Sequence, residues 1–329
     1  MKKSAILTIL LVIVLALGLG GVWRAFGRGM GLSYENADKY TAGNAVIDGA
    51  VKNLDVHWTS GDVTIAYHDE DTVELTETSK KPLSESDQLR WWLDGDTLRV
   101  QFRKPGLRLG WSLDKQLTLT LPKGAKLGTA AIELTSGDMH IPEIEANTLA
   151  LESTSGDVEV VQTGSAEEVS LNSTSGNIVA TLSDAAKVTA DTTSGNVILT
   201  QNGAVDALRA ESTSGSVSAT LERVGEGAFE STSGDVDVSI AEAGAAKLSS
   251  TSGDIRVAVG AFEDLSVDTT SGSVTAELPA EPGFAGEVSS TSGSVDSAIA
   301  LEKDGKTYRC GDGSAHLKIH TTSGDIHLQ

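Results

Sequence analysis

The sequence predicts an all-β protein, folded as a parallel β-solenoid with rungs of about 19–20 residues. Ten copies of Thr-Ser-Gly followed by Asp, Asn or Ser run from Gly137 to Gly324, and seven of the nine gaps between successive glycines are 19 or 20 residues. Apolar and polar residues alternate on both sides of each copy. Residues 131–300 contain neither Trp nor Tyr, which is typical of a narrow interior filled by aliphatic side chains.

Each repeat reads as two short strands joined at a corner. Counted from the glycine, positions −7, −5, +2 and +4 are mostly apolar, so side chains such as Val217 and Ala219 are predicted to point inward. Ser or Thr at −3 shares this phase and is expected to bond neighbouring rungs. We expect the glycine to supply a backbone angle unfavourable for other residues, and the residue after it to bond its own backbone. Short connections favour parallel stacking over an array of hairpins.

We predict one transmembrane helix within residues 1–30. An uninterrupted apolar run, 5–23, is long enough to cross a bilayer, and basic residues flank it. A cleavable signal peptide is the alternative, because small-residue pairs occur around Gly18. The slight excess of positive charge before the span places the body outside the cytoplasm. The sequence therefore predicts a single-pass cell-membrane protein with an extracytoplasmic body.

Residues 31–130 predict a β-rich cap with the first rungs, and residues 131–329 the solenoid repeats. An early strand–corner–strand unit surrounds Gly61, a hairpin is expected from Trp91 to Phe102, and a strand from Gln116 to Leu121. Between the last two repeats, residues 301–313 are expected to form a hairpin insertion. Four Trp residues concentrate in the cap region and are expected to cover the first rung: Trp58, Trp91, Trp92 and Trp111.

The negative charge belongs to the repeats. Residues 131–300 carry 27 Asp and Glu against 5 Lys and Arg, whereas the rest carries 19 against 20, which together give the net charge of −21. Such a surface repels phosphates and excludes nucleic acid as a partner. Acidic residues recur at the outward position −4, and we call this set the acidic column: Glu152, Asp191, Glu211, Glu230 and Asp268. Repetition at rung spacing would let a cationic ligand engage several carboxylates at once.

Other chemistry is poorly supported, and we predict no catalytic residue, cofactor or metal site. A sugar-cleaving β-helix enzyme needs cations and flat rings that these repeats lack. Cys310 has only His316 and His320 nearby as bases. These two histidines and His327 lack a Cys or acidic partner at zinc-ligand spacing. Aspartates after the turn glycine offer oxygen ligands for calcium, but Asn and Ser interrupt their row: Asp138, Asp157, Asp235 and Asp254.

Several segments resemble the bacterial DUF4097 family of adhesin-like envelope proteins. These are the Thr-Ser-Gly-Asp repeats, the stretch from Val51 to Asp62, the Leu-Pro-Lys-Gly step at Leu121 and the ending from Gly311 to Ile326. The resemblance covers roughly residues 45–329 and implies a β-strand-repeat domain of the cell envelope. It carries no catalytic residues.

Two classes of function remain after these exclusions. The first is a non-catalytic binding or scaffold module at the bacterial cell envelope, with a cationic peptide, a wall polymer or a membrane protein as partner. The alternative is a sensor or regulatory component of an envelope stress response that acts through a membrane partner. A polysaccharide-active enzyme is less favoured than either. An uncleaved N-terminal helix would hold the protein in the membrane.

Overall fold

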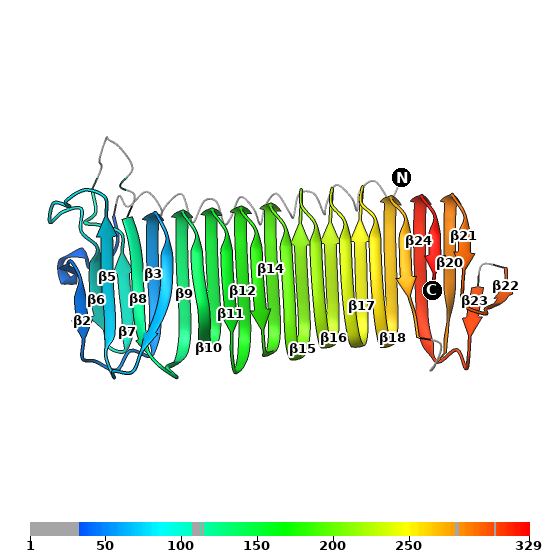
Figure 1. Ribbon diagram of the computed structural model, residues 1–329, viewed down its shortest axis with the longest axis horizontal. Helices are drawn as coiled ribbons and strands as arrows, with labels where there is room; N and C mark the ends of the chain where they lie inside the picture. The colour runs from blue at the N-terminus through cyan, green and yellow to red at the C-terminus, as the bar shows by residue number, and fades with distance from the viewer. Residues whose placement is uncertain (1–32, 107–112, 114, 280–282, 306) are drawn as a thin grey trace.

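The computed structural model describes residues 33–106, 113, 115–279, 283–305 and 307–329. They form a rod in which β-strands lie side by side across the long axis (Figure 1). Among these residues the single helical element is the 3-10 helix η1, Ala37–Lys39. The predicted all-β class is confirmed. No helix in this part of the chain is long and apolar enough to cross a membrane, and the predicted span within residues 1–30 lies outside the described residues.

The strands divide into a cap, a run of regular rungs and a C-terminal end. The cap and first rung contain β1 (Thr41–Ala42), β2 (Ala45–Ile47), β3 (Asn53–Ser60), β4 (Val63–His68), β5 (Val73–Ser79), β6 (Arg90–Asp94), β7 (Thr97–Gln101) and β8 (Lys115–Pro122). The regular rungs contain β9 (Lys126–Ser136), β10 (Met139–Ser155), β11 (Val158–Gln162), β12 (Ser165–Ser175), β13 (Ile178–Leu182), β14 (Asp184–Ser194), β15 (Val197–Ser212), β16 (Val217–Ser231), β17 (Val236–Ser250), β18 (Ile255–Ser271) and β19 (Val274–Glu277). The C-terminal end contains β20 (Phe284–Ser292), β21 (Val295–Ser297), β22 (Glu302–Asp304), β23 (Thr307–Cys310), β24 (Ala315–Ser323) and β25 (Ile326–Leu328).

The regular rungs form two parallel ladders that meet at the corner glycines. In the first ladder, the segments before each glycine pair in register, as Leu171 with Ala190 and Ala210 with Phe229. In the second ladder, the segments after it pair in register, as β13 with β15. Val217 is fully buried and Ala219 nearly so, and both inward positions are confirmed. The interior is a continuous stack of mainly aliphatic side chains running from the cap to the C-terminal end.

The corner glycines are required by close stacking of the rungs. A Cβ atom on Gly215 would lie 1.9 Å from the carbonyl oxygen of Gly195 in the preceding rung. Among the described corner glycines, only Gly61, Gly137 and Gly156 have a positive φ that disfavours other residues. The expected reason for glycine was therefore wrong for most rungs, because the limiting factor is the approach of one backbone to the next.

Side-chain hydrogen bonds also join the corners of successive rungs. Ser212 at position −3 accepts from the backbone N–H of Gly215 and donates to the carbonyl of Gly195, both at 2.8 Å. The predicted bonding of these hydroxyls to neighbouring rungs is confirmed for most rungs, whereas the buried hydroxyls of Ser153 and Ser173 at the same position have no hydrogen-bond partner among the described residues. The expectation for the residue after the glycine was wrong, since it bonds the next rung and not its own backbone. Asp157 Oδ1 accepts from the N–H of Asn177 at 2.7 Å, and Asn177 Oδ1 from that of Asn196 at 2.9 Å.

The rungs do not follow sequence order at the two ends. At the C-terminal end, β24 lies between β18 and β20, with Ile319 paired to Val267 on one side and to Val288 on the other. In space, the last repeat of the sequence, which contains β24, therefore lies between β18 and the repeat that comes before it in the sequence, which contains β20. Antiparallel strands β22 and β23 form a hairpin within the expected insertion, and β23 pairs along β20. At the N-terminal end, β3 stacks directly on β9, so the Gly61 unit is a true rung.

The cap contains a buried ion pair among its aromatic rings. The side chain of Lys115 has no exposed surface, and its Nζ lies 2.5 Å from Glu77 Oε1. The ammonium also donates to the carbonyls of Asp87, at 2.7 Å, and of Phe102, and lies 3.9 Å from the Phe102 ring centroid. Trp58 Nε1 donates to the Lys115 carbonyl at 3.2 Å. The aromatic side chains expected to cover the first rung thus also surround a buried charged pair, which was not predicted.

Candidate functional site

The acidic column is one continuous line of outward positions in the first ladder. Asn172 and Ser249 interrupt it, while three of its carboxylates occupy consecutive rungs. The pairing runs Glu152, Asn172, Asp191, Glu211, Glu230, Ser249 and Asp268. The arrangement expected from counting back four residues from each glycine is therefore present. Asp191, Glu211 and Glu230 form its densest part, and we call these three residues the acidic triplet.

The column continues beyond the predicted residues at both ends. Glu133 pairs with Glu152 in register, and His57 pairs with Glu133. At the other end, Asp268 is followed by His320 and then by Ser289. Glu133 and His57 also lie four residues before a corner glycine, at Gly137 and Gly61. The same counting rule would have found them if it had been applied to the earliest corners.

Arg209 lies beside the acidic triplet and shares the same outward face. Its Nη2 forms an ion pair with Glu211 Oε2, and its Nε lies 3.9 Å from Asp191 Oδ1. Asp191 Oδ1 is buried and has no hydrogen-bond partner among the described residues. Sequence reasoning missed this cation, although position −6 lies on the same face as position −4. The Arg209 guanidinium thus lies near two carboxylates, but it forms a close ion pair only with Glu211.

Burial perturbs two members of the acidic triplet. It raises the pKa of the Asp191 carboxyl, although the nearby Arg209 charge opposes the shift. Burial likewise raises the pKa of Glu211, where Arg209 opposes the shift and the charges of Asp191 and Glu230 add to it. Their side chains are 37% and 22% exposed. Both carboxylates are therefore incompletely solvated, and that of Asp191 is also incompletely paired, which favours an added cation at this point of the column.

A charge network terminates the column near the cap. His57 Nδ1 lies 2.8 Å from Glu133 Oε2, and its Nε2 lies 2.9 Å from Asp55 Oδ1. Burial lowers the pKa of His57, but hydrogen bonds to the two carboxylates outweigh it and raise the pKa to about 9. Arg99 also pairs with Asp55. At this end of the column, the cationic side chains of His57 and Arg99 therefore balance the carboxylates of Asp55 and Glu133. Among the described residues, the acidic triplet has only Arg209 paired with its three carboxylates.

The weak metal candidates of the sequence do not assemble into a site. His316 lies 3.1 Å from Asp264, His320 contacts Ser289, and His327 lies 4.0 Å from Asp296. The three imidazoles therefore have three different sets of neighbours. The four corner aspartates considered for calcium lie on separate rungs. In each of them, Asp138, Asp157, Asp235 and Asp254, an Oδ1 atom accepts a backbone N–H of the next rung. Cys310 is buried in β23.

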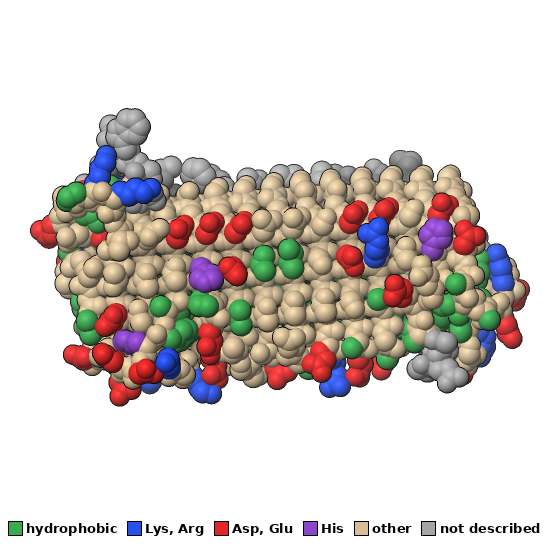
Figure 2. Space-filling view, in the orientation of Figure 1, with side chains coloured by type: hydrophobic (Ala, Val, Ile, Leu, Met, Phe, Trp, Pro, Cys, Tyr) green, Lys and Arg blue, Asp and Glu red, His purple; other side chains and the backbone are tan. Residues whose placement is uncertain are grey.

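The outward residues of the second ladder can be compared with the acidic column of the first ladder. Figure 2 shows a view in which Asp and Glu side chains lie in short separate groups and Lys and Arg are few along the middle of the rod. In the second ladder, the outward residues on successive rungs are Glu159, Val179, Ile198, Ser218 and Asp237. Val179 and Ile198 are exposed hydrophobic side chains that separate the acids there. The acids at these outward positions are therefore separated, whereas the corner aspartates Asp62, Asp138 and Asp157 do occupy three successive rungs, with the Oδ1 atoms of Asp62 and Asp138 accepting a backbone N–H of the next rung.

Comparison with solved structures finds proteins of low sequence identity to this chain. Three crystal structures align over 88% of this chain. A "putative adhesin" of Parabacteroides distasonis ATCC 8503 is 12% identical over 97% of its own chain, with a TM-score of 0.47. A "putative adhesin" of Bacteroides fragilis NCTC 9343 is 13% identical over 98%, with a TM-score of 0.36. A "putative cell adhesion protein" of Clostridium sporogenes ATCC 15579 is 10% identical over 99%, with a TM-score of 0.20.

No curated protein matches the chain. A family model described as Toastrack DUF4097 matches residues 51–264 and 243–329, which together span every corner glycine from Gly61 to Gly324. The resemblance noted from the repeats is therefore confirmed over most of the sequence, and the chain belongs to the DUF4097 family.

Proposed function

We propose that this protein is a non-catalytic, adhesin-like binding module of the bacterial cell envelope, and that its acidic triplet binds a polycationic ligand. The observation that carries the proposal is the succession of Asp191, Glu211 and Glu230 on three consecutive rungs, with Arg209 close to only one of them. Neighbouring rungs are about 4.8 Å apart, so a lysine-rich peptide can contact all three carboxylates. Names given to proteins of similar fold support an adhesive role but identify no ligand.

The expected strength of this contact follows from its multivalency. An exposed ion pair contributes about 0.2–1 kcal/mol, so three pairs contribute about 0.6–3 kcal/mol, or roughly a 3- to 150-fold change in affinity. The incomplete solvation of Asp191 and Glu211 places the effect toward the upper part of that range. Exposed charges are screened beyond about 8 Å at physiological ionic strength, so binding should weaken steeply as salt is added.

The test compares two variants with the same change in net charge. One neutralises the acidic triplet by Asp191→Asn, Glu211→Gln and Glu230→Gln. The matched control neutralises three outward carboxylates of the second ladder by Glu159→Gln, Asp237→Asn and Asp296→Asn. A lysine-rich peptide is titrated against each protein by calorimetry at low and moderate salt. We expect loss of affinity only in the triplet variant; equal losses in both variants would mean that net charge alone attracts the peptide.

We also propose that residues 1–30 anchor the protein in the membrane with the rod outside the cytoplasm. The proposal rests on the apolar run at 5–23 and on the basic residues around it. The full-length product should remain in membranes after carbonate extraction, and protease added to cells without a wall should degrade the rod. Release by carbonate, or protection until the cells are lysed, would contradict this placement.

A further inference from the structure

A second group of titratable side chains lies on the cap, away from the acidic column. It comprises His68 at the end of β4, Glu70 in the loop that follows, and Glu74 in β5. Strand β8 lies between β4 and β5, with Pro122 paired to His68 and Thr120 paired to Glu74. The loop therefore crosses over the end of β8 and brings the three side chains together on the outside of the second ladder.

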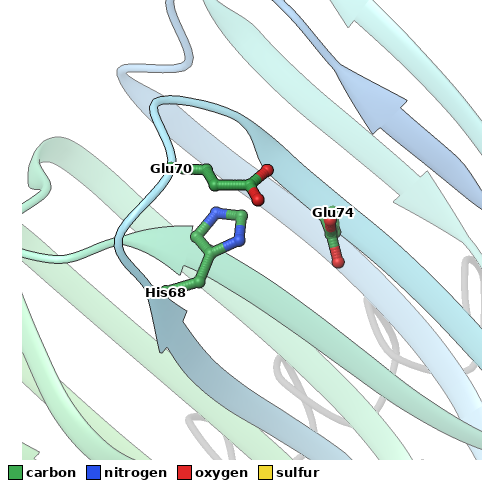
Figure 3. Close-up of side chains that lie close together, drawn as sticks. All are labelled: His68, Glu70 and Glu74. Carbon is green, nitrogen blue, oxygen red and sulfur yellow. The ribbon is translucent and has the colours of Figure 1, made fainter.

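The three side chains offer one ligand atom each within a small space. These atoms all lie within 4.8 Å of one another. Figure 3 shows the imidazole of His68 with both carboxylates beside it, Glu70 reaching from the loop and Glu74 from β5. A zinc ion with bonds of about 2.0–2.2 Å holds its tetrahedral ligands roughly 3.4 Å apart. Small rotations of exposed or half-buried side chains would reach that separation.

The hydrogen bonding of His68 favours metal binding through its other nitrogen. Nε2 lies 2.6 Å from the carbonyl oxygen of Thr72 and donates its proton there. A neutral imidazole then has its lone pair on Nδ1. Metal-binding histidines commonly donate the second ring N–H to a backbone carbonyl in this way, because it fixes the tautomer and the ring orientation. The loop carbonyl thus prepares His68 as a ligand before any ion arrives.

The charges around the group are not balanced by protein cations. The loop sequence Asp69-Glu70-Asp71 is entirely acidic, and Glu74 adds a fourth carboxylate. Lys123 pairs with Asp69 at 2.8 Å, and neither Glu70 nor Glu74 forms an ion pair with a described residue. Imidazole and carboxylate together suit zinc and related first-row divalent ions, whereas magnesium and calcium prefer oxygen ligands alone.

We propose that His68, Glu70 and Glu74 form a site for a divalent transition-metal ion of the zinc class, with water completing the coordination. The ion would connect β4, the loop and β5 across β8, and so brace the cap. This site is independent of the acidic triplet and would persist if the triplet bound nothing.

The test titrates zinc chloride into the purified full-length protein by calorimetry and repeats the titration with Glu70→Gln and His68→Ala. Glu70 is exposed in a loop, so its variant removes a ligand without disturbing the core. The matched control is His140→Ala, which removes an exposed histidine that contacts one carboxylate, Glu159, at 2.9 Å. Far-UV circular dichroism verifies the fold of each variant.

We expect one zinc ion per chain in the wild type and in the control, and at least a tenfold loss of affinity in both site variants. Zinc should also raise the melting temperature of the wild type and leave that of the Glu70→Gln variant unchanged. Wild-type protein without measurable zinc binding would overturn the proposal. Undiminished binding by a correctly folded Glu70→Gln variant would overturn it as well, since the ion would then occupy another place.

Discussion

Replacing one corner glycine by alanine should destabilise the rod through a backbone collision. In Gly215→Ala the new Cβ would lie 1.9 Å from the Gly195 oxygen, about 1.4 Å short of an ordinary carbon–oxygen contact of roughly 3.3 Å. The two rungs must separate locally by about 1.4 Å, which is roughly 30% of their spacing of about 4.8 Å. Gly215 has no positive φ of the kind that disfavours alanine, so the collision is the main cost.

The size of the effect follows from the bonds that this separation would break. Three of the bonds that join the rungs at this corner are Ser212 Oγ to the Gly195 carbonyl at 2.8 Å, the Ser214 N–H to the Thr193 carbonyl at 3.0 Å, and the Ser216 N–H to Asn196 Oδ1 at 2.9 Å. At about 1 kcal/mol each they amount to about 3 kcal/mol. Alanine restricts the unfolded chain and returns about 0.4–1 kcal/mol. The net loss should be about 2–3 kcal/mol.

Urea unfolding followed by circular dichroism measures this loss, with Ser214→Ala as the control. Ser214 is exposed in the same corner, and its backbone bond survives the substitution. The control should unfold like the wild type. A Gly215→Ala protein whose free energy of unfolding lies within about 0.5 kcal/mol of the wild type would refute the stacking explanation for the glycines that recur at the corners of this chain.

Two further predictions concern the cap. Lys115→Ala should lower the free energy of unfolding in urea by about 3–5 kcal/mol, because it leaves the Glu77 carboxylate buried without its partner. The double variant Lys115→Met with Glu77→Leu removes both charges and should recover most of that loss. Equal destabilisation by the single and the double variant would contradict the pairing. His57 has a folded pKa raised to about 9, so its contribution of about 3 kcal/mol is complete below about pH 6.5 and is lost as pH rises through about 9. Unfolding free energies at pH 6, 8 and 10 should fall in the wild type and fall less in His57→Gln; parallel curves would show that His57 is not responsible.

The inward and outward faces of the rungs could be predicted because strand side chains alternate with a period of two and each glycine marks the corner. This rule correctly placed Val217 inside, and it placed Glu211 in line with Asp191. The same rule also identifies Glu133 and His57 as outward residues of this line, because each lies four residues before a corner glycine. Arg209 could have been found in the same way, because positions −4 and −6 of a strand share one face.

The order of the final rungs could not be predicted, because the repeats are nearly interchangeable. β18 could pair with β20 or with β24, since both present an aliphatic residue at position −5, Val288 or Ile319. The Lys115–Glu77 pair and the His68 group depend on β8 lying between β4 and β5. This arrangement places β8 between two strands that follow each other in the sequence, and no periodic pattern in the sequence indicates it.

The central claim, that the acidic triplet is the place where a polycation binds, is tested most directly by locating a bound peptide. A carbodiimide joins lysine amines to carboxylates in contact with them, and mass spectrometry of the digested product identifies the carboxylates. With a lysine-rich peptide at low salt, crosslinks should concentrate on Asp191, Glu211 and Glu230 and should disappear when the salt concentration is raised. Crosslinks spread evenly over both ladders, or concentrated on Glu159 and Asp237, would contradict the claim.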